Sequence, residues 1–258
     1  MSPSSSPQRP PSGVNAAGGS RSCADVLALR LRDVRSGYGE AVVVSGVDLD
    51  VGCGEIVALL GKNGMGKSTL LKTVMGLVPL GSGEIALFGE RVDALAPHRI
   101  ARRAIAYTPQ EQALFQDLTV RENLRLGLRD DRQLDDGIAR VGAIFPFIPE
   151  RLRQHAGTLS GGEQKMLLVA RALISRPRLM LIDEITEGLQ PSVIDRLIGA
   201  LRDERERAGT AMLVVEQHVK FALAVADRYA ILKLGEIADS GAVGAAGVET
   251  RIAGQLSV

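Results

Sequence analysis

Hydrophobic and polar residues alternate along the first patterned part of the chain, which is the period of a half-buried β-strand. The alternation starts near Val26 with LALRLRDV and resumes, after a break at Gly37-Tyr38-Gly39, with VVVSGVDLDV. A short apolar run from Gly54 to Gly61 ends in a glycine-rich loop, and helical spacing follows from Lys67 to about Val78. The glycine-bracketed segment GSGEIALFGE then predicts another strand.

Helices and apolar strands alternate in the second half of the chain. The predicted strands lie at about Leu179–Ile182, Ala211–Val215 and Tyr229–Leu234. Apolar strands separated by helices indicate a parallel sheet that helices cover on both faces. In the middle of the chain, Ala104–Tyr107 predicts a short strand, and LTVRENLRLGL has helical spacing with Thr119 as its N-cap. The fold class is therefore α/β.

The first 25 residues differ from the rest in composition. They are rich in Ser, Pro and Gly and nearly lack large apolar residues. Such a segment cannot bury enough surface to offset the entropy of ordering. We therefore expect a disordered tail at 1–25. The chain as a whole has 258 residues, which is enough for one large domain or two small ones.

The charge balance limits the classes of function. Lys and Arg number 31 and Asp and Glu number 30, giving a formal net charge of +1, whereas nucleic-acid binders usually show a basic excess. Aromatic residues make up 3% of the chain and Trp is absent, which leaves little material for base stacking. The sequence shows neither an apolar run near the roughly 18 residues of a membrane span nor a signal-peptide pattern. We expect a cytoplasmic protein that does not bind nucleic acid.

The most specific motif is a phosphate-binding loop at the predicted strand–helix junction. Its residues fit the pattern G-x-x-x-x-G-K-[ST] and are Gly61, Lys62, Asn63, Gly64, Met65, Gly66, Lys67, Ser68 and Thr69. Glycines let backbone N–H groups turn towards phosphate oxygens, and the helix N-terminus adds positive potential. Lys67 can reach the β- and γ-phosphates, and Ser68 can offer its hydroxyl to Mg²⁺. The motif predicts a nucleoside triphosphate with Mg²⁺, without indicating how the nucleotide is used.

A glycine pair opens a later helix. The segment consists of Leu159, Ser160, Gly161, Gly162, Glu163 and Gln164. Ser160, with Glu163 three residues later, forms a capping box, and capping alone would account for both residues. Two glycines are a poor start for a helix unless something must approach the backbone closely, and bare amides at a helix N-terminus bind anions. A second anion site therefore stands beside simple capping as an interpretation.

Together, the two segments resemble the ATP-binding-cassette (ABC) ATPase family, whose signature is LSGGQ or LSGGEQ. The resemblance covers nearly all of residues 26–240 and leaves 241–258 unassigned. It implies a P-loop NTPase fold with a mostly parallel core sheet, an N-terminal antiparallel β subdomain and a helical subdomain at about 111–175 that carries the signature. In that family, the signature of one cassette caps the γ-phosphate held by the phosphate loop of a second cassette. The resemblance therefore implies an ATP-hydrolysing pair of cassettes, identical or paralogous.

A strand that ends in two carboxylates matches the Walker B pattern of the family. Apolar residues 179–182 precede Asp183 and Glu184. The resemblance implies that Asp183 holds Mg²⁺, directly or through water, and that Glu184 polarises the attacking water as a general base. Ile185 stands where the family usually has proline, so the chain departs from the family pattern directly beside the base.

Three single residues match further positions of the family. Gln110 corresponds to the glutamine that touches Mg²⁺ and the water and lies where the transmembrane partner docks. His218 corresponds to the histidine that contacts the γ-phosphate, and Tyr38 to the aromatic residue that stacks on adenine. The resemblance thus implies that Lys67, Glu184 and His218 are the catalytic side chains.

Two segments narrow the resemblance within the family. AGTLSGGEQKMLLVARAL and TEGLQP are similar to segments of cassettes from importers of branched-chain amino acids and of urea or short amides. This similarity implies an ATPase subunit on the inner face of the plasma membrane that powers separate transmembrane permease subunits and works indirectly with a substrate-binding protein. The alternative of another class is a soluble ABC ATPase that acts on DNA, ribosomes or protein assembly. The short gap between Gln110 and Ser160 and the single cassette disfavour it.

Overall fold

The computed structural model describes residues 27–110 and 114–257, so the tail expected at 1–25 lies outside the described residues. The strands form two sheets, which have the orders β2-β1-β4-β5 and β10-β9-β3-β8-β7-β6. The first sheet is antiparallel and consists of β1 Leu27–Tyr38, β2 Ala41–Gly52, β4 Leu80–Leu87 and β5 Glu90–Arg91. The second consists of β3 Ile56–Leu60, β6 Ile105–Thr108, β7 Leu179–Asp183, β8 Ala211–Glu216, β9 Arg228–Lys233 and β10 Glu236–Ala242.

The six-stranded sheet forms the centre of the molecule. Its pairs are parallel except for the pair of β9 and β10 at one edge. Every residue of β3, β7 and β8 is buried, as expected for a parallel sheet covered on both faces. In the register, Leu60 lies opposite Glu216 and Asp183 opposite Val215. The carboxyl ends of these three central strands therefore meet at one edge of the sheet, where ligands of α/β proteins bind.

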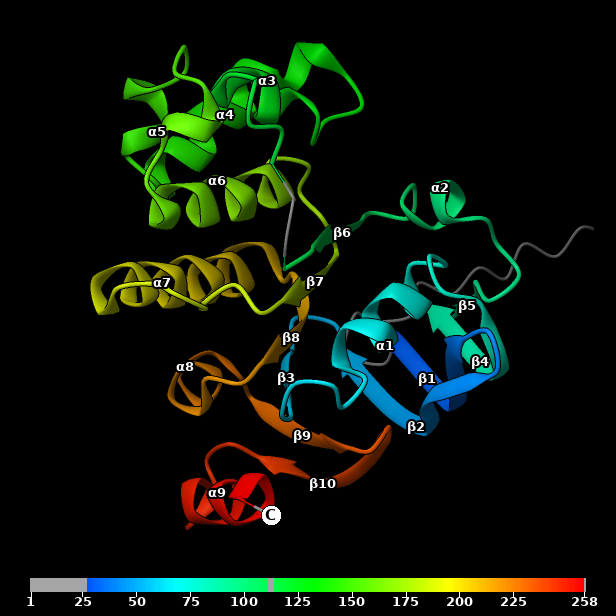
Figure 1. The fold of residues 1–258 in the computed structure, drawn as a ribbon. Coiled ribbons are helices and arrows are strands. Elements are labelled where there is room, and N and C mark those ends of the chain that lie inside the picture. Colours follow the sequence, from blue (N-terminus) through cyan, green and yellow to red (C-terminus); the bar gives the residue numbers. More distant parts are fainter. Residues whose placement is uncertain (1–26, 111–113, 258) are drawn as a thin grey trace, which may run out of the picture.

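The helices fall into distinct groups (Figure 1). They are α1 Lys67–Val74, α2 Pro97–Ile100, α3 Val120–Arg125, α4 Leu134–Ile144, α5 Phe147–Glu150, α6 Gly161–Leu173, α7 Pro191–Ala208, α8 Val219–Val225 and α9 Val248–Ser257. In Figure 1, α3 to α6 gather above the six-stranded sheet, away from the antiparallel sheet, and the signature segment opens α6. The predicted fold class, with its parallel core, antiparallel subdomain and helical subdomain, is confirmed.

One helix boundary differs from the sequence prediction. Helix α1 ends at Val74, so the helix expected to reach about Val78 is too long. Gly76, at φ 70°, turns the chain out of the helix, and a Cβ there would lie 3.1 Å from Ile100 Cδ1. The expected boundary at residue 240 falls inside β10. Beyond it, Val248 and Ile252 of α9 are buried in an apolar cluster with residues of β3 and β9.

Candidate functional site

The phosphate-binding loop connects β3 to α1. Gly66 is the N-cap of α1 at φ 99°; no side chain caps the helix, and its first turn holds no acidic residue. A Cβ at Gly66 would lie 2.9 Å from the carbonyl oxygen of Val43, and one at Gly61 would lie 2.5 Å from that of Leu232. Both positions therefore require glycine. The helix N-terminus presents amides without a side-chain cap, which is an anion-binding arrangement.

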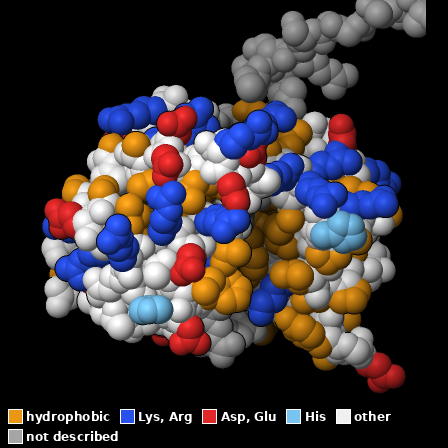
Figure 2. Space-filling model, turned by 90° about the horizontal axis from the view of Figure 1, so that it is seen from above, with side chains coloured by type: hydrophobic (Ala, Val, Ile, Leu, Met, Phe, Trp, Pro, Cys, Tyr) orange, Lys and Arg blue, Asp and Glu red, His pale blue; other side chains and the backbone are white. Residues whose placement is uncertain are grey.

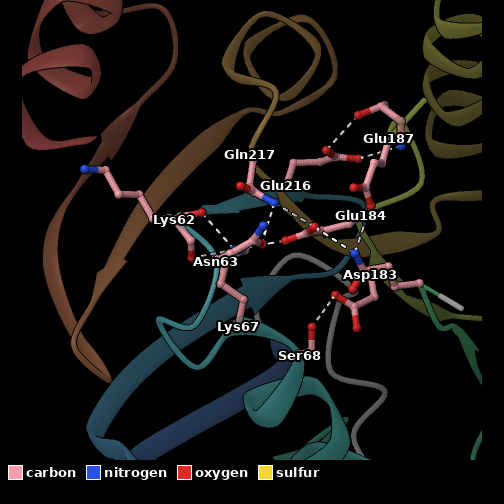
Figure 3. A network of polar contacts seen from close by, with 12 residues as sticks. Lys62, Asn63, Lys67, Ser68, Asp183, Glu184, Glu187, Glu216 and Gln217 are labelled. Carbon is pink, nitrogen blue, oxygen red and sulfur yellow. Dashed lines mark hydrogen bonds and ion pairs between the residues drawn. The ribbon is translucent and has the colours of Figure 1, made fainter. Parts of the chain in front are cut away.

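Lys67 lies almost entirely inside this loop. The residue is 4% exposed, and Nζ donates to the carbonyl oxygens of Gly61 at 2.8 Å and Lys62 at 2.9 Å. The same amine pairs with Glu184 Oε1 at 2.9 Å. Lys62 contributes only its backbone, because its side chain points away from the cluster (Figure 3). The loop and a carboxylate from the neighbouring strand end thus fix the ammonium group in place.

Glu184 is held from three sides at the carboxyl end of β7. Besides Lys67, the amides of Gln110 and Gln217 donate to Oε2 at 3.1 Å and 2.8 Å. Its backbone has φ 46°, the left-handed region, and its N–H donates to the carbonyl oxygen of Val215 at 2.9 Å. A residue with a Cβ in this region costs about 1–3 kcal/mol and persists where the surroundings enforce it, often at active sites. The fold therefore directs the Glu184 carboxylate towards Lys67.

Asp183 forms a second polar centre beside it. The hydroxyl of Ser68 donates to Oδ1 at 2.9 Å, and the phenol of Tyr107 donates to Oδ2 at 3.3 Å. Burial raises the pKa of the Asp183 carboxyl, the bond from Ser68 opposes this, and nearby Glu184 raises the pKa further. The same burial, with Asp183 beside it, raises the pKa of Tyr107. A hydroxyl and a carboxylate facing each other are oxygen ligands of the kind that Mg²⁺ prefers.

The outer contacts of the site come from four segments. Gln110 also donates to Glu187 Oε2 at 3.0 Å, and Gln217 donates to Asn63 Oδ1 at 2.6 Å. His218 is exposed and caps α8, where its Nδ1 accepts from the backbone N–H of Phe221 at 3.2 Å. Tyr38, at the end of β1, is 54% exposed. In the described ranges, no hydrogen bond or ion pair joins the side chain of His218 or Tyr38 to the Lys67–Glu184 pair.

The signature segment lies on the helical subdomain. Ser160 Oγ accepts from Glu163 N at 3.3 Å and donates to Glu163 Oε2 at 2.9 Å, so the capping box is closed. A Cβ at Gly161 would meet nothing within 4 Å, whereas one at Gly162 would lie 3.0 Å from Val193 Cγ2. Across the described part of the chain, no hydrogen bond or ion pair links 159–164 to the phosphate loop. The segment therefore leaves the phosphate loop of its own chain uncovered.

Comparisons with known proteins identify the family. The family model described as ABC transporter matches residues 44–187, which is more than half of the chain. The high-affinity branched-chain amino acid transport ATP-binding protein BraG of Pseudomonas aeruginosa is 42% identical over 211 residues, covering 80% of this chain and 89% of the relative. The chain belongs to the ABC transporter ATP-binding family. It is an ATP-hydrolysing cassette of that family.

Other relatives differ in their transport roles. The probable branched-chain amino acid transport ATP-binding protein LivF of Archaeoglobus fulgidus is 36% identical and covers 83% of this chain and 91% of its own length. The lipopolysaccharide export ATP-binding protein LptB of Escherichia coli K12 is 38% identical, with 82% and 89% covered. These relatives place the cassette in the family without separating import from export.

Solved structures agree with the fold of the cassette. An ATP-binding subunit of an ABC transporter has a TM-score of 0.76 at 28% identity, over 87% of this chain and 98% of that chain. A dimeric cassette bound to ADP and Pi has a TM-score of 0.74 at 24% identity, over 84% and 99%. Within the residues that the structure describes, no helix of the cassette is long and apolar enough to cross a membrane.

Sequence reasoning missed several residues that surround the two carboxylates. They are Tyr107, Thr186, Glu187, Glu216 and Gln217. A usable signal existed for some of them, because Tyr107 and Glu216 stand near the carboxyl ends of strands that pair with β7. Polar residues at that edge of a parallel sheet are candidates for the site. For Glu187, which lies in the loop beyond β7, the sequence carries no comparable signal.

Proposed function

We propose that this cassette is the ATP-hydrolysing subunit of an importer for branched-chain amino acids. It acts at the inner face of the plasma membrane, bound to transmembrane permease subunits that receive their substrate from a separate binding protein. The observation that carries the ATPase part is the meeting of Lys67, Asp183 and Glu184 at one edge of the central sheet. The transport part is supported by the likeness to BraG and LivF.

ATP binds first to the phosphate loop. The uncapped amides at the start of α1 surround the β- and γ-phosphates, and Lys67 exchanges its contacts with the carbonyls of Gly61 and Lys62 for phosphate oxygens. The remaining loop residues, Asn63, Gly64, Met65 and Thr69, shape the cradle. Tyr38 is exposed at the end of β1, where its ring is free to stack on adenine.

Mg²⁺ fits beside Ser68 and Asp183. The hydroxyl and the carboxylate lie 2.9 Å apart, and the side-chain oxygen of Gln110 supplies a further hard ligand from the neighbouring loop. Among the described residues, no group of three or more His, Cys, Asp or Glu side chains is arranged to hold a metal by itself. An ion here would therefore share its shell with nucleotide oxygens and water. When bound, Mg²⁺ neutralises phosphate charge.

Glu184 acts as the general base for hydrolysis. Its carboxylate accepts the proton of a water that attacks the γ-phosphorus in line, while Lys67 stabilises the charge on the transferred group. The amides of Gln110 and Gln217 hold the carboxylate in its orientation. His218 begins the next helix and caps it through Nδ1, which leaves the other ring nitrogen to contact the γ-phosphate once the nucleotide is bound.

Closure of the site requires a second cassette. Ser160, Gly161 and Gly162 of the partner cover the γ-phosphate, with Leu159, Glu163 and Gln164 supporting that helix start. The open space around Gly161 supports this role, because another chain can approach the backbone there. Two nucleotides are then enclosed between two cassettes, and water is excluded from both. Hydrolysis removes the group that bridges the two halves, so the pair opens.

The permease docks on the side of the helical subdomain. Seen from that side, hydrophobic side chains border a hollow between two lobes of the molecule (Figure 2). A cavity of about 420 Å³ lies between β6 and α6, and Phe115 and Leu126 line it while 57% and 54% exposed. Tyr107 also lines it and donates to Asp183 at the ATP site. The docking face and the ATPase site therefore share a side chain.

The nucleotide-bound pair provides the test of the ATPase mechanism. Glu184→Gln should keep ATP binding and stop hydrolysis, so that ATP holds two cassettes together and light scattering after size exclusion reports twice the monomer mass. The matched control Glu184→Gln with Lys67→Ala should stay monomeric. A variant that binds ATP but remains a monomer at every concentration would contradict closure by a second copy.

Substrate and direction are tested with the permease subunits. The cassette, co-purified with its permeases in vesicles, should drive ATP-dependent uptake of labelled leucine or isoleucine in the presence of the binding protein. Uptake of urea or a short amide instead would favour the related importer class, and extrusion of a lipid would favour the export role of LptB. A cassette that binds no membrane protein and acts on a soluble assembly would refute transport.

A further inference from the structure

Glu216 is a buried acid to which sequence reasoning assigned no role in the site. It is the last residue of β8 and is 2% exposed. It lies opposite Leu60 in the sheet, and its neighbour Val215 lies opposite Asp183. The side chain therefore sits between the strand that leads into the phosphate loop and the strand that carries the two catalytic carboxylates (Figure 3).

The carboxylate of Glu216 holds the loop that follows Glu184. Its Oε2 accepts from the hydroxyl of Thr186 at 2.8 Å, and its Oε1 accepts from the backbone N–H of Thr186 at 3.2 Å. Thr186 is 6% exposed, and Ile185 between it and Glu184 is fully buried. One carboxylate thus binds both donors of a residue that is two positions from the base.

Glu216 also leads directly into the connection after β8, which carries His218 two positions further on. Between them lies Gln217, whose side chain reaches across to Glu184 Oε2 at 2.8 Å and to Asn63 of the phosphate loop at 2.6 Å. Glu216 is therefore the point at which the loop after the base and the loop with His218 are joined.

Burial raises the free energy needed to ionise the Glu216 carboxyl. Desolvation raises the pKa of Glu216 to about 7, with nearby Glu184 raising it further and the two donors of Thr186 opposing the rise. No basic side chain of the described residues pairs with it. The titratable side chains on the elements around it include Asp183 at the end of β7, Glu184 and Glu187 in the loop after it, Lys67 of α1 and His218. The buried Glu216 carboxylate lowers the stability of the fold and has no counter-ion, so its role is better explained by the residues that it positions.

We propose that Glu216 is a positioning residue of the ATPase site, which locks the loop after Glu184 to the loop carrying His218 through its bonds with Thr186. While Glu216 is bonded to Thr186, Glu184 and His218 keep a fixed distance as nucleotide and partner cassette bind. When these bonds are broken, the loop after Glu184 loses its support. The proposal rests on the role proposed for Glu184 and adds the residue that holds it.

Steady-state hydrolysis by the purified chain tests this lock. Glu216→Gln keeps the shape of the side chain but has only one acceptor oxygen, so its NH2 group would face one of the two Thr186 donors. We expect kcat to fall about tenfold or more, while KM for ATP stays within about twofold. Thr186→Val removes the hydroxyl and keeps the backbone donor, so it should lose less, about threefold. Thr186→Ser should restore the wild-type rate, because it restores the hydroxyl.

The pH profile separates positioning from a general loss of structure. Wild-type kcat should rise as Glu216 ionises, with a midpoint near its pKa of about 7, and Glu216→Gln should lack that rise. The matched control is Glu204→Gln, since Glu204 is also buried and accepts from Thr210 Oγ1 at 3.1 Å at the other end of β8. It should leave kcat and the profile unchanged.

The outcomes are distinct. Wild-type kcat and an unchanged profile in Glu216→Gln would overturn the lock, as would an equal loss in Glu204→Gln. If Glu216→Gln fails to fold, the Thr186→Val and Thr186→Ser pair decides in the same assay. A wild-type chain that does not hydrolyse ATP, or a Glu184→Gln variant that still does, would instead refute the role of the base and leave the lock without a reaction to serve.

Discussion

Two helix starts in this cassette are predicted to meet the same phosphate, and they are built in opposite ways. Helix α1 begins at Gly66 in the left-handed conformation, with no side-chain cap and no acid in its first turn. Helix α6 begins at Ser160, whose hydroxyl and backbone are both engaged by Glu163 in a closed capping box. One start leaves its amides for a ligand, and the other satisfies part of them within its own chain.

The difference teaches which half of the site is complete in one chain. The phosphate loop has uncapped amides and a fixed cation in Lys67, so we predict that a single cassette suffices to bind the phosphates. The signature helix is stable without a ligand, because Glu163 takes the place of an anion at its N-terminus. Under the proposed mechanism, it adds binding energy only when a partner brings it to a nucleotide. Changes at α1 should therefore abolish binding, and changes at α6 should affect closure.

The largest effect is expected for Lys67→Ala. The substitution removes the ammonium group proposed to face the phosphates and leaves Glu184 buried without its counter-ion. We expect kcat/KM for ATP hydrolysis to fall by about a thousandfold or more, together with ATP affinity. Fluorescent ATP-analogue titration and a phosphate-release assay measure the two losses. Normal affinity in this variant would show that the loop amides alone hold the nucleotide.

A smaller and different effect is expected for Gly161→Asp. A side chain at this position meets nothing within 4 Å, and a carboxylate in the first turn favours the helix, so the chain should fold normally. Its charge would oppose the γ-phosphate of the partner, so hydrolysis should fall by about a hundredfold while ATP affinity of the monomer stays unchanged. Equal losses of affinity and hydrolysis would mean that α6 acts on its own chain.

Ser160→Ala should have a moderate effect on both stability and rate. Losing the capping box should lower the free energy of unfolding by about 1 kcal/mol, as read from urea denaturation. The matched control is Thr119→Ala, because Thr119 and Glu122 form the same closed box at the start of α3. Both variants should lose similar stability, but only Ser160→Ala should lose hydrolysis, by about tenfold. Equal rates of ATP hydrolysis in the two variants would show that Ser160 serves only as a helix cap.

The smallest effect is expected for Tyr107→Phe. Its hydroxyl donates to Asp183 over 3.3 Å, a long bond, while Ser68 holds the other oxygen at 2.9 Å. Without the phenol, the Mg²⁺ concentration for half-maximal hydrolysis should rise by about two- to threefold, with kcat nearly unchanged. A Mg²⁺ titration at saturating ATP measures this shift, and a large fall in kcat would assign Tyr107 a direct part in the chemistry.

Local sequence patterns predicted most of the fold. The loop 61–69 was predictable because glycine spacing, an apolar strand and a helix coincide there, and the closed box at Ser160 followed from Glu163 three residues later. The end of α1 was not predictable, because the chain turns at Gly76 next to Ile100, which lies 24 positions further along the chain. Strand β10 alternates exposed and half-buried residues, and its pairing with β9 depends on a turn at Gly235.

The site was predictable only as far as its residues fall in contiguous motifs. Glu184 and Lys67 could be named, but their 2.9 Å ion pair joins the residue after β7 to the start of α1, 117 positions apart, and depends on sheet order. The support behind Glu184 was out of reach for the same reason. Thr186 stands in a segment that the resemblance singled out, but nothing in the sequence indicates that it bonds to Glu216; these bonds depend on β7 and β8 being neighbours in the sheet.

Mixing two inactive variants tests the division between the two helix starts most directly. Lys67→Ala keeps its signature and loses its phosphate loop, whereas Gly161→Asp keeps its phosphate loop and loses its signature. If the site is formed from two chains, a pair of one variant with the other contains one complete site. ATP hydrolysis should therefore reappear when the two purified inactive proteins are combined, and rise with their concentrations. No recovery, in a mixture where the two variants are shown to pair, would contradict the account.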